Sequence, residues 1–330
     1  MSLRIIKSGV LDTIQDSGRY RFQHLGINPG GAMDRFASRA ANILVGNNGH
    51  EALIELHFPS AILLFEQQAL ITLTGADFSA TINGDPVPLW QPLLLAKNSI
   101  LQFQRLKQGA RCYLAIREKL NIPIWLNSYS TNLKAAAGGF CGRALQKNDV
   151  IPFQERHEYK NIFNQSDFVV LPWKANSWWN DQATEKVRVV AGKEWSWLSE
   201  KSKHRFLNHA FRIGSLADRM GYHLQTNLHA SGNAELVSSA VTFGTIQLLP
   251  NGELIILMAD HQTTGGYPRL GYVISAHLPR LAQKQTGDTI HFALTTPQES
   301  EQLFFKQERH LRQLQNACRF RLEEFLNAHH

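Results

Sequence analysis

Apolar residues in this chain occur mainly in short runs separated by Gly- or Asn-containing turns, a spacing typical of β-strands. The predicted strands are 4–10, 61–73, 93–103 and 112–117 in the first half, then 187–190, 211–213, 245–248, 254–259 and 289–293 in the second. No regular alternation of strand and helix runs through the chain. The pattern therefore favours a mainly β protein of barrels or sandwiches over a doubly wound parallel sheet.

Three segments have helical periodicity instead. Apolar residues from Met33 to Leu44 follow i, i+3, i+4 spacing, and Gly46 ends the predicted helix. A short helix is predicted around 278–283. The C-terminal helix, predicted over 297–328, has Thr296 as its N-cap, then Pro and Glu in its first turn. Its apolar stripe consists of Leu311, Leu314, Cys318, Leu322 and Phe325. We expect this stripe to dock on its own domain, with an inter-chain contact as the alternative.

The pattern weakens between residues 154 and 184, where tryptophans stand among Asn, Asp and Ser. This region is interpreted as a linker. The predicted organisation is a first half over 1–184, a second half over 185–296 and the C-terminal amphipathic helix over 297–328.

Composition narrows the class of protein. A hydrophobic fraction of 43% and a charged fraction of only 18% argue against disorder. No apolar run approaches the twenty residues that a membrane span needs, and the first residues lack a signal-peptide pattern, so a cytoplasmic location is expected. The three cysteines are far apart and fit reduced thiols better than a disulfide framework.

The net charge of +7 comes partly from basic residues at 201–205 and along the C-terminal tail. Nucleic acid is one class of partner for such a surface, but no nucleic-acid-binding motif matches. Solvated faces or an acidic protein partner are the favoured interpretation, and no nucleic-acid partner is predicted.

The most informative polar segment is 260–268, which directly follows the apolar run 254–259. Asp260 is followed by an amide, two hydroxyls and two glycines, and glycine allows a ligand or another backbone to approach closely. This composition indicates a polar cluster at the mouth of a sheet or barrel. A well hydrogen-bonded structural loop is the alternative.

Common catalytic motifs are missing from the sequence. It contains no P-loop, no Gly-x-Ser-x-Gly elbow, and no His-Glu-x-x-His or paired Cys-x-x-Cys. No metal site is therefore predicted. Other polar, glycine-bearing segments do occur, at 13–19, 30–34, 127–143 and 218–222, and together with 260–268 they are too many for a plain scaffold.

Several of these segments carry a family resemblance. They are Thr-Ile-Gln-Asp-x-Gly-Arg at 13–19, Gly-Gly-Ala-Met-Asp at 30–34, Ala-Asn-x-Leu-Val-Gly-Asn at 41–47, Thr-Gly-Ala at 74–76, Gly-Arg-Ala-Leu at 142–145, Asp-Arg-Met-Gly-Tyr at 218–222, Gly-Thr-Ile-Gln at 244–247 and Asp-x-Gln-Thr-Thr-Gly-Gly-Tyr-Pro at 260–268. In this order they resemble the biotin-dependent carboxyltransferase-like family called KipA, allophanate hydrolase subunit 2 or the 5-oxoprolinase C subunit (PxpC). Arg117-Glu118, His223, Ser239 and His277 depart from the family pattern, which bears on substrate more than on fold.

The resemblance implies two cyclophilin-like β-barrel domains, which we expect to be antiparallel and similar in topology. It implies a KipI-like or subunit-B-like partner and, for an oxoprolinase, a LamB/YcsF-type A subunit. Three functions stay open, of which the first is favoured and the other two are alternatives. The first is the C subunit of an ATP-dependent 5-oxoprolinase, a hydrolase that opens 5-oxo-L-proline to L-glutamate. The second is a carboxyltransferase or allophanate hydrolase-type subunit that acts on urea-like amides. The third is a non-catalytic regulator that binds a KipI-like inhibitor of a sensor histidine kinase.

The chemistry of lactam opening then suggests roles for residues in these motifs. Asp260 would orient or deprotonate a ring N–H or a water, and the nearby donors would stabilise developing oxyanions. The predicted catalytic residues are Asp260, Thr263, Thr264 and Tyr267. The predicted substrate- or phosphate-binding residues are Arg219, Gln262, Gly265 and Gly266. Second-tier residues are Gln15, Asp16, Arg19 and Gln247.

ATP is expected to bind a site shared with the partner subunit. No biotinylation motif is present, so any biotin would arrive on another protein. Asp260→Asn is expected to cost activity with little loss of stability.

Overall fold

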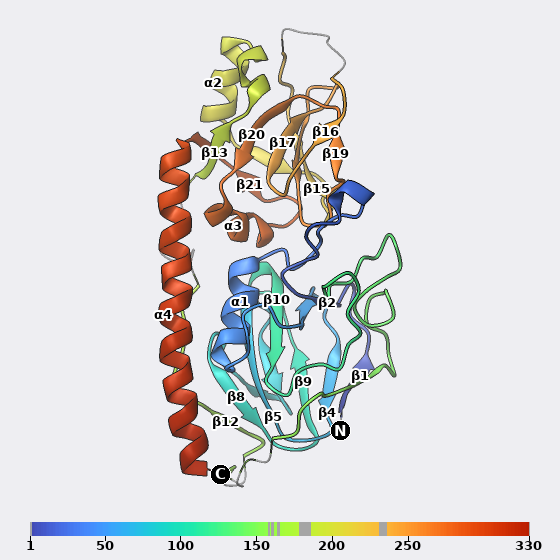
Figure 1. The fold of residues 1–330 in the computed structure, drawn as a ribbon, viewed down its shortest axis with the longest axis vertical. Coiled ribbons are helices and arrows are strands. Elements are labelled where there is room, and N and C mark those ends of the chain that lie inside the picture. The colour runs from blue at the N-terminus through green and yellow to red at the C-terminus, as the bar shows by residue number, and fades with distance from the viewer. Residues whose placement is uncertain are drawn as a thin grey trace. The chain divides into compact units, whose positions relative to one another are not determined.

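The computed structural model describes residues 2–157, 159, 162–163, 166–177, 186–230 and 236–329. Contacts within the chain divide it into two compact units (Figure 1). The first unit holds Met1–Gly18, Asp34–Asn180 and Glu308–His330, and the second unit holds Arg19–Met33 and Asp181–Gln307. Each unit is therefore assembled from separate stretches of sequence. The boundary expected between residues 184 and 185 lies outside the described residues.

The first unit consists of two six-stranded sheets around one apolar core. Their strand orders are β11-β1-β4-β9-β6-β7 and β12-β8-β5-β10-β3-β2. The bounds are β1 Ser2–Lys7, β2 Thr13–Gln15, β3 Leu53–Leu56, β4 Ile62–Phe65, β5 Ala69–Asp77, β6 Ala80–Ile82, β7 Asp85–Pro86, β8 Pro92–Leu95, β9 Ser99–Phe103, β10 Gln108–Ile116, β11 Val150–Pro152 and β12 Phe168–Val170. Both sheets contribute fully buried side chains to the core, among them Leu3, Phe65, Ile71 and Leu114.

Helix α1, Arg35–Leu44, packs on the second of these sheets, against β5 and β10. The Asp34 carboxylate caps the helix by accepting from the Ala37 N–H at 2.8 Å. Thr74 on β5 donates its hydroxyl to the Ala37 carbonyl at 2.8 Å, and the Tyr113 hydroxyl on β10 accepts from the Asp34 N–H at 2.7 Å. The helix predicted from Met33 to Leu44 is confirmed, and Gly46 beyond it has a φ of 78°.

The second unit is built on one eight-stranded sheet of order β21-β14-β15-β18-β17-β20-β13-β22. The bounds are β13 Val187–Ala191, β14 Phe211–Ile213, β15 Gly221–Gln225, β17 Thr245–Leu248, β18 Leu254–Leu257, β20 Arg269–Val273, β21 Thr289–Ile290 and β22 Phe292–Leu294. The two edge strands, β21 and β22, are neighbours in sequence, so the sheet is a nearly closed barrel. A separate pair joins β16, Ser239–Ala240, to β19, Thr264–Gly265.

One strand pair of this barrel corrects the expectation of purely antiparallel pairing. Strands β13 and β22 run parallel, with Val187 opposite Phe292. A parallel pair needs a long connection, and here the rest of the barrel supplies it. The mainly β architecture with few helices confirms the predicted fold class.

Among the described residues, the helices other than α1 are η1 Gln23–Leu25, η3 Lys193–Trp197, α2 Glu200–Asn208, η4 Ser275–His277, α3 Leu278–Ala282 and α4 Pro297–His329. Helix α2 was not predicted, because only Ser202 and Phe206 are buried in it and its basic residues hide the periodicity. Two predicted strands were too long: 61–73 splits into β4 and β5, and 93–103 into β8 and β9.

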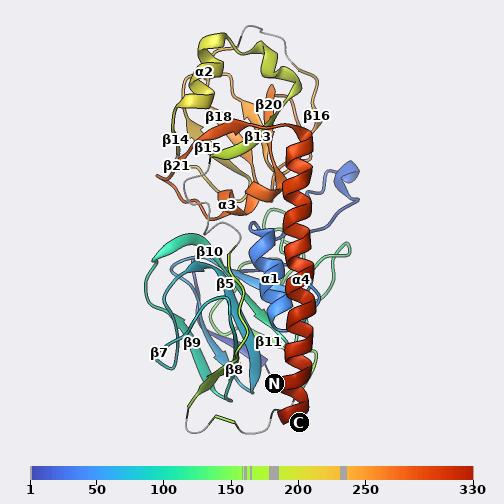
Figure 2. The same ribbon diagram turned by 90° about the vertical axis from the view of Figure 1, so that its left-hand side faces the viewer.

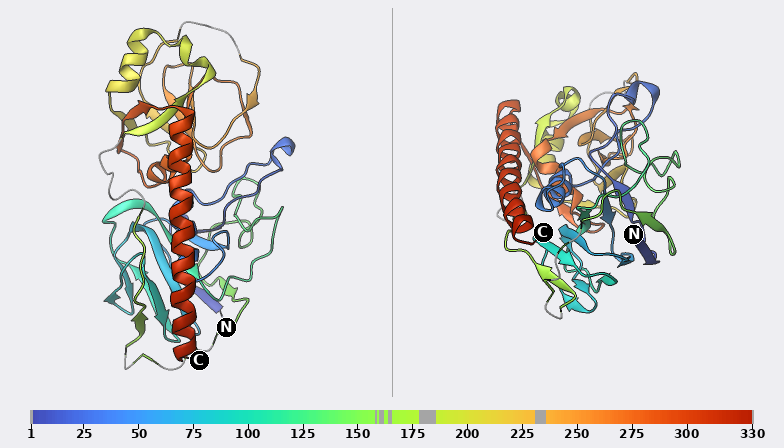
Figure 3. Two further views of the ribbon diagram at one scale, coloured as in Figure 1. Left: turned by 60° about the vertical axis from the view of Figure 1, so that its left-hand side comes forward. Right: turned by 60° about the horizontal axis from the view of Figure 1, so that its bottom comes forward.

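Helix α4 is continuous along its length (Figure 3). The predicted capping box is confirmed, since Glu299 N–H donates to Thr296 Oγ1 at 3.2 Å and Thr296 N–H donates to Glu299 Oε2 at 3.4 Å. Beyond Glu308 the helix belongs to the first unit and lies beside α1 (Figure 2). The predicted stripe docks there, with Leu311, Cys318 and Leu322 buried.

Glu118 generates a prediction about the pH dependence of stability. It is fully buried, accepts from Tyr159 Oη at 2.9 Å and from Leu70 N–H, and burial raises its pKa from 4.5 to about 7. Below pH 4.5 the group is protonated in both the folded and unfolded states. As pH rises from 4.5 to 7 only the unfolded state loses the proton, so stability falls. Glu118→Gln keeps the acceptor oxygen without the charge. We expect it to raise the free energy of unfolding by up to about 3 kcal/mol at pH 8 and to change little near pH 4.5.

Denaturant titrations at both pH values would measure this difference. Glu200→Gln is the control, because its side chain is 89% exposed on α2. A Glu118→Gln effect that is equal at both pH values would contradict the assignment of the cost to a buried charge.

Candidate functional site

Asp260 lies where strand β18 leaves the barrel of the second unit. The preceding residues, Met258 and Ala259, are buried, and the backbone from 258 to 260 runs along the loop 218–222. Asp260 N–H donates to the Arg219 carbonyl at 2.8 Å, and Met258 N–H donates to the Met220 carbonyl at 2.9 Å. Two motifs that are distant in sequence are thus joined by backbone hydrogen bonds.

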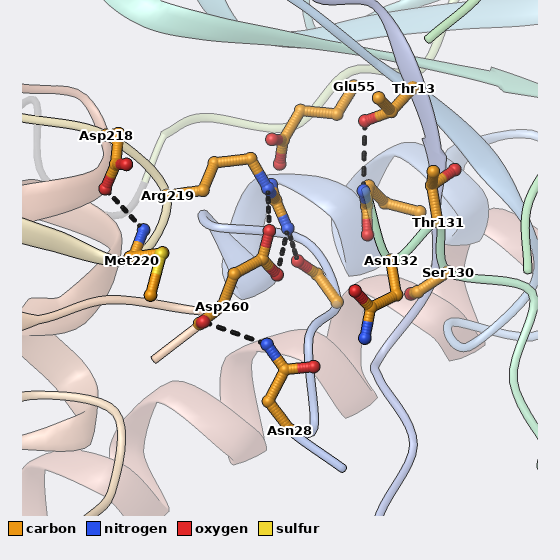
Figure 4. A network of polar contacts seen from close by, with 12 residues as sticks. Thr13, Asn28, Glu55, Ser130, Thr131, Asn132, Asp218, Arg219, Met220 and Asp260 are labelled. Atoms are coloured by element: carbon orange, nitrogen blue, oxygen red, sulfur yellow. Dashed lines mark hydrogen bonds and ion pairs between the residues drawn. The ribbon is translucent and has the colours of Figure 1, made fainter. Parts of the chain in front are cut away.

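Arg219 and Asp260 form a bidentate ion pair (Figure 4). The Nε–Oδ2 distance is 2.8 Å and the Nη2–Oδ1 distance is 3.0 Å. The side chains are only 5% and 15% exposed. Asp218, the sequence neighbour of Arg219, instead accepts from the Met220 and Gly221 N–H groups. Because the Asp218 carboxylate is used in this turn, the Arg219 guanidinium pairs with the Asp260 carboxylate instead. The two groups form two parallel N–H···O bonds, for which their planar shapes are well matched.

The segment 19–33 of the second unit completes this cluster. Arg219 Nη2 also donates to the Gly31 carbonyl at 2.7 Å, and Asn28 Nδ2 donates to the Asp260 carbonyl at 2.9 Å. Gly30 has a φ of +61°, and a Cβ there would lie 3.2 Å from Arg19 Nη1 and 3.5 Å from Asp260 Oδ1. The buried Arg19 guanidinium and the Asp260 carboxylate therefore both lie next to Gly30. Sequence reasoning missed Asn28, whose only signal is its place before the Gly-Gly motif.

A second group gathers around Gln247 on β17. Gly265 is buried on β19, and a Cβ there would lie 2.6 Å from Gln247 Nε2. Gln247 is fully buried and donates a long bond of 3.4 Å to the Tyr267 carbonyl. Its Oε1 has no hydrogen-bond partner within the described ranges. Neither Gly265 nor Gly266 has a positive φ, so these glycines serve close approach rather than an unusual backbone conformation.

A brace of Arg269, Glu194 and Ser239 adjoins this group and was not predicted. Arg269 donates to both Glu194 oxygens, at 3.3 Å and 3.2 Å, and to Ser239 Oγ at 2.7 Å. Burial alone would raise the pKa of Glu194, but the bonds from Arg269 and its charge leave it below its usual value. Because Ser239 pairs with Gly265, the brace fixes the strand that carries Thr264.

The remaining predicted residues of this loop are more exposed. Gln262, Thr264 and Tyr267 are exposed, and Thr263 is half-buried with its carbonyl accepting from Val241 N–H at 3.2 Å. In the described part of the chain, no side-chain hydrogen bond joins either threonine to Asp260. The structure thus brings together Arg219 with Asp260, and Gln247 with Gly265 and Tyr267.

Gln15 and Asp16 belong to the first unit. Asp16 braces the loop 128–130, since its carboxylate accepts from Ser128 Oγ and the Tyr129 N–H, each at 2.7 Å, and from Ser130 Oγ. Gln15 Nε2 donates to Thr13 Oγ1 at 2.9 Å (Figure 4), and its buried Oε1 has no partner among the described residues.

The two units share one local arrangement. The shared sequence is Thr-Ile-Gln, at 13–15 on β2 and at 245–247 on β17. In each strand the isoleucine points into the apolar core of its unit, and the fully buried glutamine points to the opposite face of the sheet. In each, the amide oxygen is the atom without a partner among the described residues. A buried acceptor left open in this way suits a donor on a ligand or a water.

Two further properties hold within the described ranges. No group of three or more His, Cys, Asp or Glu residues there could hold a metal ion. No helix there is long and apolar enough to cross a membrane.

Residues 25–294 match the carboxyltransferase domain, subdomain A and B. The chain belongs to this family. It is 35% identical over 303 residues to the 5-oxoprolinase C subunit of Haemophilus influenzae, covering 92% of this chain and 94% of that protein. It is 32% identical over 313 residues to the 5-oxoprolinase C subunit of Escherichia coli, covering 94% and 97%. The crystal structure of the K. lactis urea amidolyase has the same fold, with a TM-score of 0.83 at 24% identity over 95% of this chain. The present chain matches only 20% of the length of the K. lactis urea amidolyase chain.

The Arg219–Asp260 pair leads to a prediction that differs from the sequence-based expectation of little stability loss. Asp260→Asn removes the counter-charge of a buried guanidinium, so we expect the free energy of unfolding to fall by about 2–4 kcal/mol. A double-mutant cycle with Arg219→Met should give a coupling energy above about 1 kcal/mol. The matched control is Glu324→Gln in the exposed Arg321–Glu324 pair on α4, which should change stability by under about 0.5 kcal/mol. Equal effects of Asp260→Asn and Glu324→Gln would exclude a structural role for the pair.

Proposed function

We propose that this chain is the C subunit of an ATP-dependent 5-oxoprolinase, which opens 5-oxo-L-proline to L-glutamate together with partner subunits. The observation that carries the proposal is the identity of 35% and 32%, over more than nine-tenths of both chains, to two proteins with that name. A role in an enzyme complex follows from the same relatives. The partners that we propose are a KipI-like or subunit-B-like protein and a LamB/YcsF-type A subunit.

The geometry supports a role for the Arg219–Asp260 cluster in holding the substrate. Each Asp260 oxygen accepts one bond from Arg219 and keeps a lone pair that can accept from a ring N–H or a water. Arg219 and Arg19 bring positive charge to the same place, which suits the carboxylate of 5-oxoproline or a phosphoryl oxygen. In this scheme Asp260 orients both the ring N–H or water of the reaction and the guanidinium of Arg219.

The polar loop beyond Asp260 supplies donors for the tetrahedral intermediate. Once the lactam oxygen is phosphorylated by ATP, water adds to the same carbon and the ring C–N bond breaks as the nitrogen takes a proton. A second water then hydrolyses the resulting acyl phosphate to glutamate and inorganic phosphate. The hydroxyls of Thr263, Thr264 and Tyr267 are placed on or beside β19, where they can donate to a developing oxyanion. Gln262, Gly265 and Gly266 are proposed to line the site of the tetrahedral intermediate. Gln247, whose side chain lies next to Gly265, is proposed to support this loop.

ATP is proposed to activate the lactam oxygen by phosphorylation, at a site shared with a partner subunit. The positive charge of the buried arginines in the cluster complements the negative charge of a transferred phosphoryl group. The chain has no P-loop, so the remaining phosphate contacts are assigned to the partner.

Carboxyl transfer to a urea-like amide is the second candidate, because the matching family is described as a carboxyltransferase domain and the K. lactis urea amidolyase shares the fold. Carboxybiotin would then be delivered by another protein. The two candidates differ in what they consume. ADP release that depends on 5-oxoproline, without bicarbonate or a biotinylated protein, supports the oxoprolinase. Dependence on both of these would favour carboxyl transfer.

The purified chain alone is expected to release no ADP from ATP with 5-oxoproline, and to gain activity only when both partner subunits are added. The reason is that the chain contains no complete nucleotide-binding motif. A coupled ADP assay on the chain, the partners and the mixture measures this. Turnover by the chain alone, at the rate of the mixture, would show that the site is complete in one polypeptide.

Asp260→Asn is expected to lower kcat of the assembled complex by roughly 10²-fold or more, the usual worth of a positioned acid–base group. Since the variant is also expected to be less stable, the rate is expressed per folded molecule, measured by circular dichroism at the assay temperature. Glu324→Gln serves as the comparison and should leave turnover unchanged, because Glu324 is exposed on α4. Near-normal turnover per folded Asp260→Asn molecule would remove Asp260 from the reaction centre.

A further inference from the structure

The first unit contains a pocket that the proposed reaction does not use. It lies between α1, the turn at 48–50 and the later part of α4, and its volume is about 230 Å³. Its lining residues are Arg39, Ile43, Asn48, Gly49, His50, Leu311, Arg312 and Gln315. Ile43 and Leu311 are buried and give the pocket an apolar floor, whereas the other side chains form a polar rim.

The charge around this pocket is predominantly positive. Arg39 and Arg312 are permanent cations, and His50 adds a third basic side chain whose Nδ1 contacts Ser17 Oγ. The acid that faces them is Glu308, which accepts from both terminal nitrogens of Arg39. The bonds from Arg39, followed by the charges of Arg39, Arg312 and His50, hold the pKa of Glu308 below its usual value despite partial burial. One carboxylate therefore balances only part of the local positive charge.

Arg39 also retains an unused donor. Its Nε–H is buried and has no hydrogen-bond partner among the described residues, although its Nη groups are held by Glu308. A buried donor without a partner costs free energy unless a ligand or water satisfies it. The amides of Asn48 and Gln315 supply further donors on the same rim.

We propose that this pocket binds a small, multiply charged organic anion, either a phosphate ester or a dicarboxylate. The cations and amide donors recognise the anionic groups, and the apolar floor contacts a short carbon body. The volume suits a small metabolite and is below that of a typical pocket for a drug-sized ligand. The site is separate from the Arg219–Asp260 cluster, since all its residues belong to the first unit.

Isothermal titration calorimetry of the full chain at an ionic strength of about 0.15 M, where the Debye length is about 8 Å, tests the proposal. The probes are 2-phosphoglycolate, glycerol 3-phosphate and glutarate, so the phosphate ester and dicarboxylate sources are distinguished. We expect saturable binding of at least one probe. Arg312→Gln should weaken that binding about tenfold, the worth of one charge-assisted hydrogen bond. Because Arg312 is exposed on α4, this variant should fold normally, which its melting temperature verifies.

Arg319→Gln is the matched control, because Arg319 lies on the same helix, 66% exposed, outside the pocket. It removes the same charge and should leave binding within about twofold, since surface charges separated by about a Debye length are largely screened. Equal weakening by Arg312→Gln and Arg319→Gln would show a diffuse electrostatic effect and overturn the site. The absence of saturable binding for all three probes would overturn it as well. Neither result depends on oxoprolinase activity, which the ADP assay tests separately.

Discussion

The pairing of Arg219 with Asp260 is the interaction on which the proposed site depends. A single guanidinium connects the loop 218–222, the end of β18 and the Gly31 carbonyl. Since both side chains are largely out of solvent, their charges must compensate each other. The pair thus places one carboxylate at a defined position and orientation.

Buried polar groups recur in the first unit, where they serve a different purpose. Tyr113 donates to Glu55 at 2.8 Å while accepting from Asp34 N–H, and all three residues are fully buried. Burial, followed by the charges of Glu55 and Asp34, raises the pKa of Tyr113 well above its usual value, which keeps it a hydroxyl donor. These hydrogen bonds, together with the bond from Thr74 to the Ala37 carbonyl, tie the start of α1 to β5 and β10.

How much could be predicted from sequence depended on the range of the interactions involved. The capping box at Thr296 and Glu299 and the helix after Asp34 were predictable because their residues lie within one or two turns. Helix α2 was missed because its basic residues dominate the pattern. The mainly β class followed from the short apolar runs, but the parallel β13–β22 pair depends on closure of the barrel and leaves no local signal.

The candidate site shows the same limit. Asp260 was singled out by the polar loop that follows a buried strand, and the family resemblance supplied Arg219. Their partnership was not predictable, because Asp218 stands beside Arg219 in sequence and offered a nearer carboxylate. The Arg269–Glu194–Ser239 brace joins residues from three separate segments, so only the folded structure reveals it.

The interrupted order of the two units has a consequence for how the protein forms during synthesis. Residues 19–33 belong to the second unit but are made before nearly all of the first. Asn28 is separated from Asp260, its hydrogen-bond partner, by 232 positions. At ordinary elongation rates this interval is roughly 10 to 50 seconds. The segment is therefore without its partners for this interval, and the second unit closes only after the residues up to Asp260 have been made.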